Sequence, residues 1–192
     1  GVPHGIGLVK LMGRHAGYIA ANTCLATGQD SFCLIPEVPF KLEGQGGLLE
    51  LIEDRVALRR HAVIVVAEGA GQQFFAGESK SLGKDASGNA KLGDIGIYLK
   101  DRVTAHFAQK NLDVTLKYIA PSYLIRSAPA NSTDQLHCSR LAQNAVHAAM
   151  AGKSGLLIGY WHGEMTHVPT SALSGLTQNV NPHGELWFNV LE

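Results

Sequence analysis

Apolar residues form several short runs along this chain, and such runs are typical of strands buried in a sheet. The runs that predict strands cover residues 6–11, 31–35, 62–67, 113–119, 154–159, 164–168 and 186–190. The strongest of them, residues 62–67 (AVIVVA), is apolar at every position and rich in β-branched side chains. Because a central parallel strand is buried on both faces, we expect this run to lie in the middle of a parallel sheet.

Between these runs, apolar residues recur at the three- and four-residue spacing of a helix with one buried face. This spacing predicts helices over residues 16–27, 48–60, 94–109 and 132–152. In the second, Leu48, Ile52 and Val56 form one stripe. Asp94 is expected to cap the third, and residues 132–135 (STDQ) have the spacing of a capping box. Helices that alternate with strands predict βαβ units around a largely parallel sheet.

Two irregular segments interrupt this alternation. Residues 72–89 are polar and rich in glycine and serine, and we expect them to form a mobile surface excursion. Residues 120–126 contain Pro121 and are expected to form a turn that presents Tyr123 and Arg126. A domain boundary is expected near Asn131, where an irregular stretch precedes the capped helix.

Composition narrows the class of protein. The chain has 192 residues, 45% of them hydrophobic, which is typical of a globular fold. The 16 basic residues balance the 16 acidic ones, so the net charge argues against a nucleic-acid-binding protein. No apolar run has the length of a membrane span.

Cys24, Cys33 and Cys138 are widely spaced in apolar surroundings, and we expect reduced core thiols in an intracellular, cytoplasmic protein. The start at Gly1 without methionine predicts a fragment of a longer protein.

Candidate chemistry gathers where the first and third predicted strands end. The turn Met12-Gly13-Arg14 leads into a predicted helix. The free N–H groups at the start of that helix and the forked guanidinium of Arg14 both suit an anion. Glu68 follows the run 62–67 and opens a glycine-rich loop, at the edge where open α/β sheets bind ligands. From spacing alone, an ordinary turn with a solvated arginine and a solvated loop glutamate remain alternatives.

Other constellations receive no support from the spacing. The nine histidines include no His-x-x-x-His pair beside an acid, so we expect structural or surface histidines and no metal site. Ser122 lacks the glycine-flanked elbow of a hydrolase nucleophile. Neither a Gly-x-x-x-x-Gly-Lys-Ser/Thr loop nor a Gly-x-Gly-x-x-Gly turn is present.

Four stretches resemble one family in order and spacing. They are residues 8–14 (LVKLMGR), 36–40 (PEVPF), 65–69 (VVAEG) and 117–126 (KYIAPSYLIR), and residues 94–99 and 142–147 extend the match. Together they resemble the 6-phosphofructokinases, in the branch of the plant-type ATP-dependent enzymes and their pyrophosphate-using relatives. The resemblance implies an α/β, phosphofructokinase-like three-layer sandwich, with a largely parallel sheet and flanking helices, from a two-domain protein. It implies that residues 1–130 bind fructose 6-phosphate and that residues 131–192 return toward a nucleotide-binding domain.

The resemblance also implies roles for single residues. Met12, Gly13 and Arg14 match the fructose 6-phosphate turn, with Arg14 as the catalytic cation near the transferring group. Glu68 matches the glutamate that hydrogen-bonds the sugar hydroxyls. The family's residues that bind the 6-phosphate of the sugar are matched by Tyr123, Arg126 and Lys117.

The implied activity is phosphoryl transfer from ATP to the 1-hydroxyl of fructose 6-phosphate, a glycolytic reaction that often shows allosteric control. The implied cofactor is Mg²⁺. The donor loop, the catalytic base and the magnesium ligands of the family are expected upstream of Gly1, so the fragment alone is expected to be inactive. The resemblance further implies a homo-oligomer, a dimer or a tetramer, with neither a nucleic acid nor a membrane as partner.

Three departures from the family pattern keep other functions open. Ala120 stands where this branch has aspartate, Gly5 stands near a bacterial-type arginine, and residues 161–163 (WHG) replace an asparagine-containing stretch. One alternative is a pyrophosphate-dependent fructose 6-phosphate 1-phosphotransferase. Another is a non-catalytic sugar-phosphate-sensing subunit on the same fold, and the third is an unrelated α/β domain with chance matches.

Overall fold

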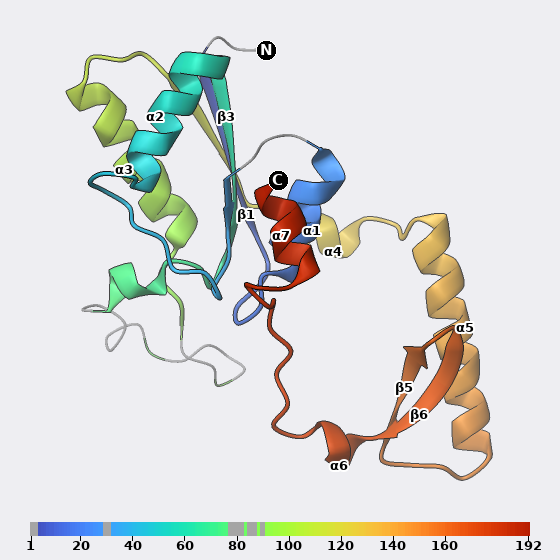
Figure 1. Ribbon diagram of the computed structural model, residues 1–192. Coiled ribbons are helices and arrows are strands. Elements are labelled where there is room, and N and C mark those ends of the chain that lie inside the picture. Colours follow the sequence, from blue (N-terminus) through green and yellow to red (C-terminus); the bar gives the residue numbers. More distant parts are fainter. Residues whose placement is uncertain (1–3, 29–31, 77–82, 84–87, 89–90) are drawn as a thin grey trace. The chain divides into compact units, whose positions relative to one another are not determined.

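The computed structural model describes residues 4–28, 32–76, 83, 88 and 91–192, and its chain forms two compact units (Figure 1). The first unit contains Gly1–Tyr123 together with Asn179–Glu192, and the second contains Leu124–Gln178. The functional division expected near Asn131 stays a prediction. The last segment of the chain belongs with the first unit because α7, described below, packs on α1 there.

A four-stranded parallel sheet forms the centre of the first unit. Its strands are β1 (Gly5–Leu11), β2 (Phe32–Leu34), β3 (His61–Ala67) and β4 (Thr115–Ile119), in the order β2-β3-β1-β4. Leu11 pairs with Ala67, and Val9 pairs with Ile119. All carboxyl ends therefore meet at one edge, and the predicted central place of residues 62–67 is confirmed.

Helices cover both faces of this sheet and complete the three-layer sandwich (Figure 1). On one face lie α2 (Leu48–Arg59) and α3 (Ile95–Gln109), and on the other lie α1 (Tyr18–Thr27) and α7 (Glu185–Leu191). The apolar stripes predicted for α2 and α3 are buried in the core, and their members are Leu48, Ile52, Val56, Ile95, Leu99, Val103 and Phe107. The fold class expected from the sequence is confirmed for this unit.

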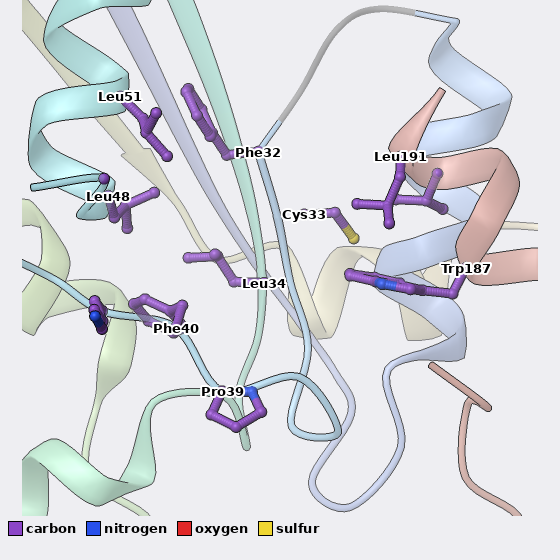
Figure 2. A pocket seen from close by; sticks show the side chains of 12 residues that line it. Phe32, Cys33, Leu34, Pro39, Phe40, Leu48, Leu51, Trp187 and Leu191 are labelled. Carbon is purple, nitrogen blue, oxygen red and sulfur yellow. The ribbon is translucent and has the colours of Figure 1, made fainter. Parts of the chain in front are cut away.

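The final element is a helix, so the strand predicted over residues 186–190 is wrong. Leu186, Trp187 and Val190 pack into the cluster on the α1 face of the sheet. In Figure 2, Trp187 and Leu191 lie beside Cys33 of the edge strand β2. A short apolar run does not distinguish a strand from a buried helix, and here contact with α1 decides between them.

The carboxylate of Glu37 connects the segment before α1 with the segment before α7. The N–H of Gly17, before α1, donates to Glu37 Oε1 at 3.0 Å and to Oε2 at 3.1 Å. The N–H of Val180, before α7, donates to the same Oε1 at 2.8 Å. A side chain at position 17 would overlap Ile35, which explains the glycine there. Glu37, expected in a proline-held loop, is therefore a structural residue.

We expect Glu37→Ala to destabilise the protein by about 3 kcal/mol, because charge-assisted hydrogen bonds are lost and two N–H groups are left unpaired. Urea unfolding followed by the fluorescence of the buried Trp187 measures the change. The matched control is Glu164→Ala, since Glu164 is exposed in the second unit. Equal midpoints for both variants would contradict the role of Glu37.

The second unit consists of one long helix, a hairpin and a short helix. They are α5 (Ser132–Met150), the antiparallel pair β5 (Leu156–Trp161) and β6 (Glu164–Pro169), and α6 (Thr170–Leu173). The cap of α5 is Asn131, whose side chain accepts from the Asp134 N–H at 2.9 Å, so the capping box predicted from Ser132 begins one residue too late. Cys138 on α5 is exposed, which corrects its expected place in the core.

The segment expected as a mobile excursion begins with ordered structure. A 3₁₀ helix, η1 (Gln72–Phe75), brings Phe74 and Phe75 against the core beside Tyr98. Most of the remaining predicted excursion lies outside the described residues. In the described part of the chain, no helix has the length and apolarity to cross a membrane.

Candidate functional site

The turns after β1 and β3 interlock at the carboxyl edge of the sheet. The N–H of Glu68 donates to the Leu11 carbonyl oxygen at 2.9 Å, and the N–H of Gly69 donates to the Gly13 carbonyl oxygen at 3.0 Å. These bonds continue the pairing of the two strands beyond their ends. They bring the Arg14 turn against the loop that begins with Glu68.

Two glycines make this close approach possible. Gly13 has φ = 142°, a conformation that L-residues with side chains rarely adopt, and a Cβ there would lie 2.6 Å from the Ala16 carbonyl oxygen. A Cβ on Gly69 would overlap the carbonyl group of Arg14. The backbone of the Met12–Arg14 turn is thus pressed directly against the loop that carries Glu68.

The side chains at this edge combine opposite charges in a partly accessible place. Met12, Arg14 and Glu68 are all half-buried. A guanidinium offers a fork of N–H donors that suits phosphate, whereas a carboxylate accepts hydrogen bonds from hydroxyl groups. The pair therefore suits a ligand that carries both a phosphate and hydroxyl groups.

Tyr123 and Arg126 lie on a short helix, so the turn expected over residues 120–126 is wrong. The helix is α4 (Ser122–Ser127), which follows β4 and Pro121. Residues three apart leave the same side of a helix, so both side chains project from one side of α4. Tyr123 is 82% exposed. Because β4 is the neighbour of β1, α4 begins at the same sheet edge as the Arg14 turn.

Lys117 lies apart from Arg14 and Glu68 in the first unit. It is an exposed residue inside β4 and pairs in register with Gly7 of β1. The Arg14 turn, in contrast, follows the end of β1 at Leu11. Strand register therefore places Lys117 several residues back from the edge, and the first unit does not bring it together with Arg14 and Glu68.

The structure adds an ion pair that the sequence analysis did not connect with the site. Lys10 Nζ lies 2.8 Å from Asp94 Oδ2. Burial disfavours the charged ammonium, but the hydrogen bond to Asp94 keeps the pKa of Lys10 above its ordinary value. Burial likewise opposes the charged carboxylate, yet the bonds from Lys10 and from the N–H groups of α3 hold the pKa of Asp94 below its ordinary value. Both groups are charged at neutral pH.

The predicted cap of α3 is confirmed in the same place. Asp94 Oδ1 accepts from the N–H groups of Gly96 at 3.0 Å and Ile97 at 3.1 Å. The sequence shows Asp94 as a cap, but its second partner comes from β1, far away in the chain. The signal available in the sequence was the shared resemblance of residues 8–14 and 94–99 to one family.

A pocket of about 480 Å³ opens elsewhere on the first unit, at the edge strand β2 (Figure 2). It is lined by residues of β2, α2 and α7 and by the loop residues Pro39, Phe40, Lys41 and Gly46, and none of the predicted site residues belongs to it. Across the described ranges, no three His, Cys, Asp or Glu side chains come together as metal ligands.

A parallel sheet between two helical layers, with a cation and a carboxylate at the ends of its central strands, defines the chain as an α/β protein. Residues 3–149 match the sequence profile of the family described as Phosphofructokinase. The chain is 50% identical over 194 residues to an ATP-dependent 6-phosphofructokinase of Borreliella burgdorferi, which covers 98% of this chain and 43% of the relative. This protein chain belongs to the phosphofructokinase family.

Further relatives come from other organisms. An ATP-dependent 6-phosphofructokinase of Amycolatopsis methanolica is 48% identical over 99% of this chain and 42% of its own length. ATP-dependent 6-phosphofructokinase 7 of Arabidopsis thaliana is 45% identical over 98% of this chain and 39% of its own length. The chain thus spans less than half the length of each of these relatives.

Solved structures agree on the fold. A crystal structure described as pyrophosphate-dependent phosphofructokinase from Marinobacter aquaeolei matches with a TM-score of 0.69. The match covers 97% of this chain and 46% of the other, at 22% identity. A structure described as phosphofructokinase from Saccharomyces cerevisiae matches with a TM-score of 0.59 over 87% of this chain and 20% of the other, at 24% identity.

Proposed function

We propose that this chain supplies the sugar-phosphate site of a 6-phosphofructokinase, which transfers a phosphoryl group from ATP to the 1-hydroxyl of fructose 6-phosphate. One observation carries the proposal. The turns of Arg14 and Glu68 interlock through the Gly69–Gly13 hydrogen bond at the carboxyl edge of the sheet. The turn that carries Arg14, a cation suited to phosphate, thereby contacts the loop that carries Glu68, a carboxylate suited to hydroxyl groups.

Each residue has a distinct role in this proposal. Glu68 accepts hydrogen bonds from the sugar hydroxyls and orients the acceptor. Arg14 neutralises charge on the transferring group, while Met12 and Gly13 shape the turn around the sugar. Positioning and charge neutralisation are the main sources of catalysis in phosphoryl transfer, and both depend on a rigid edge of the sheet.

The 6-phosphate is assigned to α4 in the same proposal. Tyr123 donates its hydroxyl hydrogen to the phosphate, and Arg126 offers a forked guanidinium. Lys117 is the weakest member of the proposed site because its strand register keeps it back from the edge. The proposed division assigns fructose 6-phosphate binding to residues 1–130 and a return toward a nucleotide-binding domain to residues 131–192.

ATP is the proposed donor, because the curated relatives at 45–50% identity are named ATP-dependent enzymes. The alternative donor is pyrophosphate, since the matching protein from Marinobacter aquaeolei is described as pyrophosphate-dependent. The proposed reaction uses Mg²⁺, for which the described residues offer no ligand cluster. A cytoplasmic homo-oligomer completes the proposal.

A coupled assay of the full-length protein tests the activity, with fructose 6-phosphate as acceptor and either ATP or pyrophosphate as donor. Turnover with ATP alone supports the proposal, and turnover with pyrophosphate alone supports the alternative. If neither donor gives turnover while fructose 6-phosphate still binds, the protein is a sugar-phosphate sensor on this fold.

We expect Arg126→Ala in the full-length protein to raise the KM for fructose 6-phosphate about a hundredfold, because a charge-assisted fork to phosphate is lost. The KM for the donor is expected to stay unchanged. Arg140→Ala, on α5, is the matched control for loss of an exposed arginine. An unchanged KM for the sugar in Arg126→Ala would reject the assignment of Arg126.

A further inference from the structure

Three side chains outside the proposed site contact the two residues before α3, Gly93 and Asp94. The first is Lys10 of β1, which forms the ion pair with Asp94 described above. The second is Tyr118 of β4, whose hydroxyl donates to Asp94 Oδ1 at 3.4 Å. The third is Gln72 of η1, which binds Gly93. The segment before α3 therefore links two strands and the loop after a third.

Gln72 makes the link to Glu68 directly. Its side-chain amide donates to the carbonyl oxygen of Glu68 at 3.0 Å and to that of Gly93 at 3.1 Å. Its amide oxygen accepts from the Gly93 N–H at 3.0 Å. One partly buried amide thus makes three hydrogen bonds, which fix the loop of Glu68 to the residue that precedes the Asp94 cap.

Tyr118 fits against the first turn of α3 only because position 96 is glycine. A Cβ on Gly96 would overlap the hydroxyl end of the Tyr118 ring. Lys10 Nζ also lies over that ring, 6.0 Å from its centroid. Lys10, Tyr118 and Asp94 therefore form one packed polar cluster on the α3 face of the sheet.

Each link leads to a segment that carries a proposed site residue. Lys10 precedes the Arg14 turn at the end of β1, and Gln72 holds the backbone of Glu68 itself. Tyr118 stands near the end of β4, just before the segment that leads to Tyr123. The three segments that must keep a fixed spacing around one ligand are thus tied to a common point.

We propose that Lys10 and Gln72 are positioning residues of the sugar-phosphate site, which hold the Arg14 and Glu68 turns at a fixed separation through Gly93 and Asp94. This inference rests on the proposed function. Its physical basis is that catalytic groups must stay within about 0.5 Å of their productive geometry, and that an error of about 1 Å costs up to a hundredfold in rate.

The chain offers a matched control at the opposite end of the same helix. Lys110 Nζ, at the C-cap of α3, lies 2.5 Å from Glu53 Oε2 of α2. The hydrogen bonds from Lys110 and His106 hold the pKa of Glu53 below its ordinary value, so this pair is also charged. Lys110→Met removes a similar ion pair of α3, but at the end remote from the carboxyl edge of the sheet.

The kinetic test compares Lys10→Met, Gln72→Leu and Lys110→Met in the full-length protein. We expect the first two to raise the KM for fructose 6-phosphate about tenfold, since the acceptor groups lose their alignment. The KM for the donor is expected to stay unchanged, and Lys110→Met is expected to retain both KM values. Lys10→Arg is expected to recover most of the loss, because it restores the ion pair with Asp94.

A second measurement separates this inference from the proposed function. Amide hydrogen exchange reports the mobility of peptides that cover residues 12–17 and 67–73, whether or not the protein turns over substrate. We expect faster exchange of both peptides in Lys10→Met and Gln72→Leu, but not in Lys110→Met. Exchange that is unchanged in the first two, or equally faster in all three, would overturn the positioning role. Absence of turnover in the wild-type protein would instead reject the proposed function.

Discussion

Gly69→Ala is expected to abolish phosphoryl transfer to fructose 6-phosphate while most of the protein remains folded. A methyl group at position 69 overlaps the carbonyl group of Arg14, and because these are backbone atoms, the turn itself has to shift. The hydrogen bond from the Gly69 N–H to Gly13 must break, and the Arg14 and Glu68 turns must separate. Because misplacement by about 1 Å costs up to a hundredfold, a larger displacement is expected to lower kcat/KM by about a thousandfold or more.

Gly7→Ala is the matched control for this substitution. Gly7 also lies in the first unit, in β1, but a Cβ there meets no atom within 4 Å. We expect nearly unchanged kcat/KM for Gly7→Ala, and circular dichroism checks that both variants retain their helices. If Gly69→Ala kept wild-type kcat/KM, the interlocked turns would not form the site.

The second large effect is expected for Arg14→Ala. If Arg14 neutralises charge on the transferring group, its removal lowers kcat about a hundred- to thousandfold, as for other groups that stabilise charge in the transition state. The KM for fructose 6-phosphate is expected to change much less than in Arg126→Ala. Steady-state kinetics with each substrate varied in turn separates the two parameters.

Arg14→Lys and Arg102→Ala make this second prediction specific. Lysine keeps the charge but lacks the forked donors, so Arg14→Lys is expected to recover only part of the rate. Arg102 is exposed on α3 and pairs with Glu43, remote from the interlocked turns, and its loss is expected to leave kcat unchanged. A wild-type kcat in Arg14→Ala would show that another group carries the charge.

Local patterns predicted the elements of the first unit where one physical cause dominates. The stripe of Leu48, Ile52 and Val56 determines which face of α2 is buried, whatever lies against it. Asp94 caps α3 through N–H groups two and three residues away, so the contact is encoded within one turn. These interactions are short in sequence, and a pattern of neighbours is sufficient to predict them.

The candidate site was predictable in part. Arg14 and Glu68 follow apolar runs, and the rule that parallel strands end at one edge brings them together without further information. The same rule does not place Lys117, because its position depends on the register between β4 and β1. Nor does it reveal the contacts of Gln72. In the sequence this residue belongs to a polar loop, and only the structure shows its hydrogen bonds to Glu68 and Gly93.

The sequence by itself determined the alternation of the strands of the parallel sheet with the long helices, the buried faces of α2 and α3, and the residues that follow β1 and β3 at the carboxyl edge of the sheet. Only the tertiary structure decided that residues 185–191 form a helix, that Gly69 presses against Arg14, and that Lys10, Gln72 and Tyr118 meet before α3. The physical reason is the range of the forces involved. Hydrogen bonds along a helix and periodic burial act between near neighbours in the chain, whereas packing joins residues that only the folded protein brings into contact.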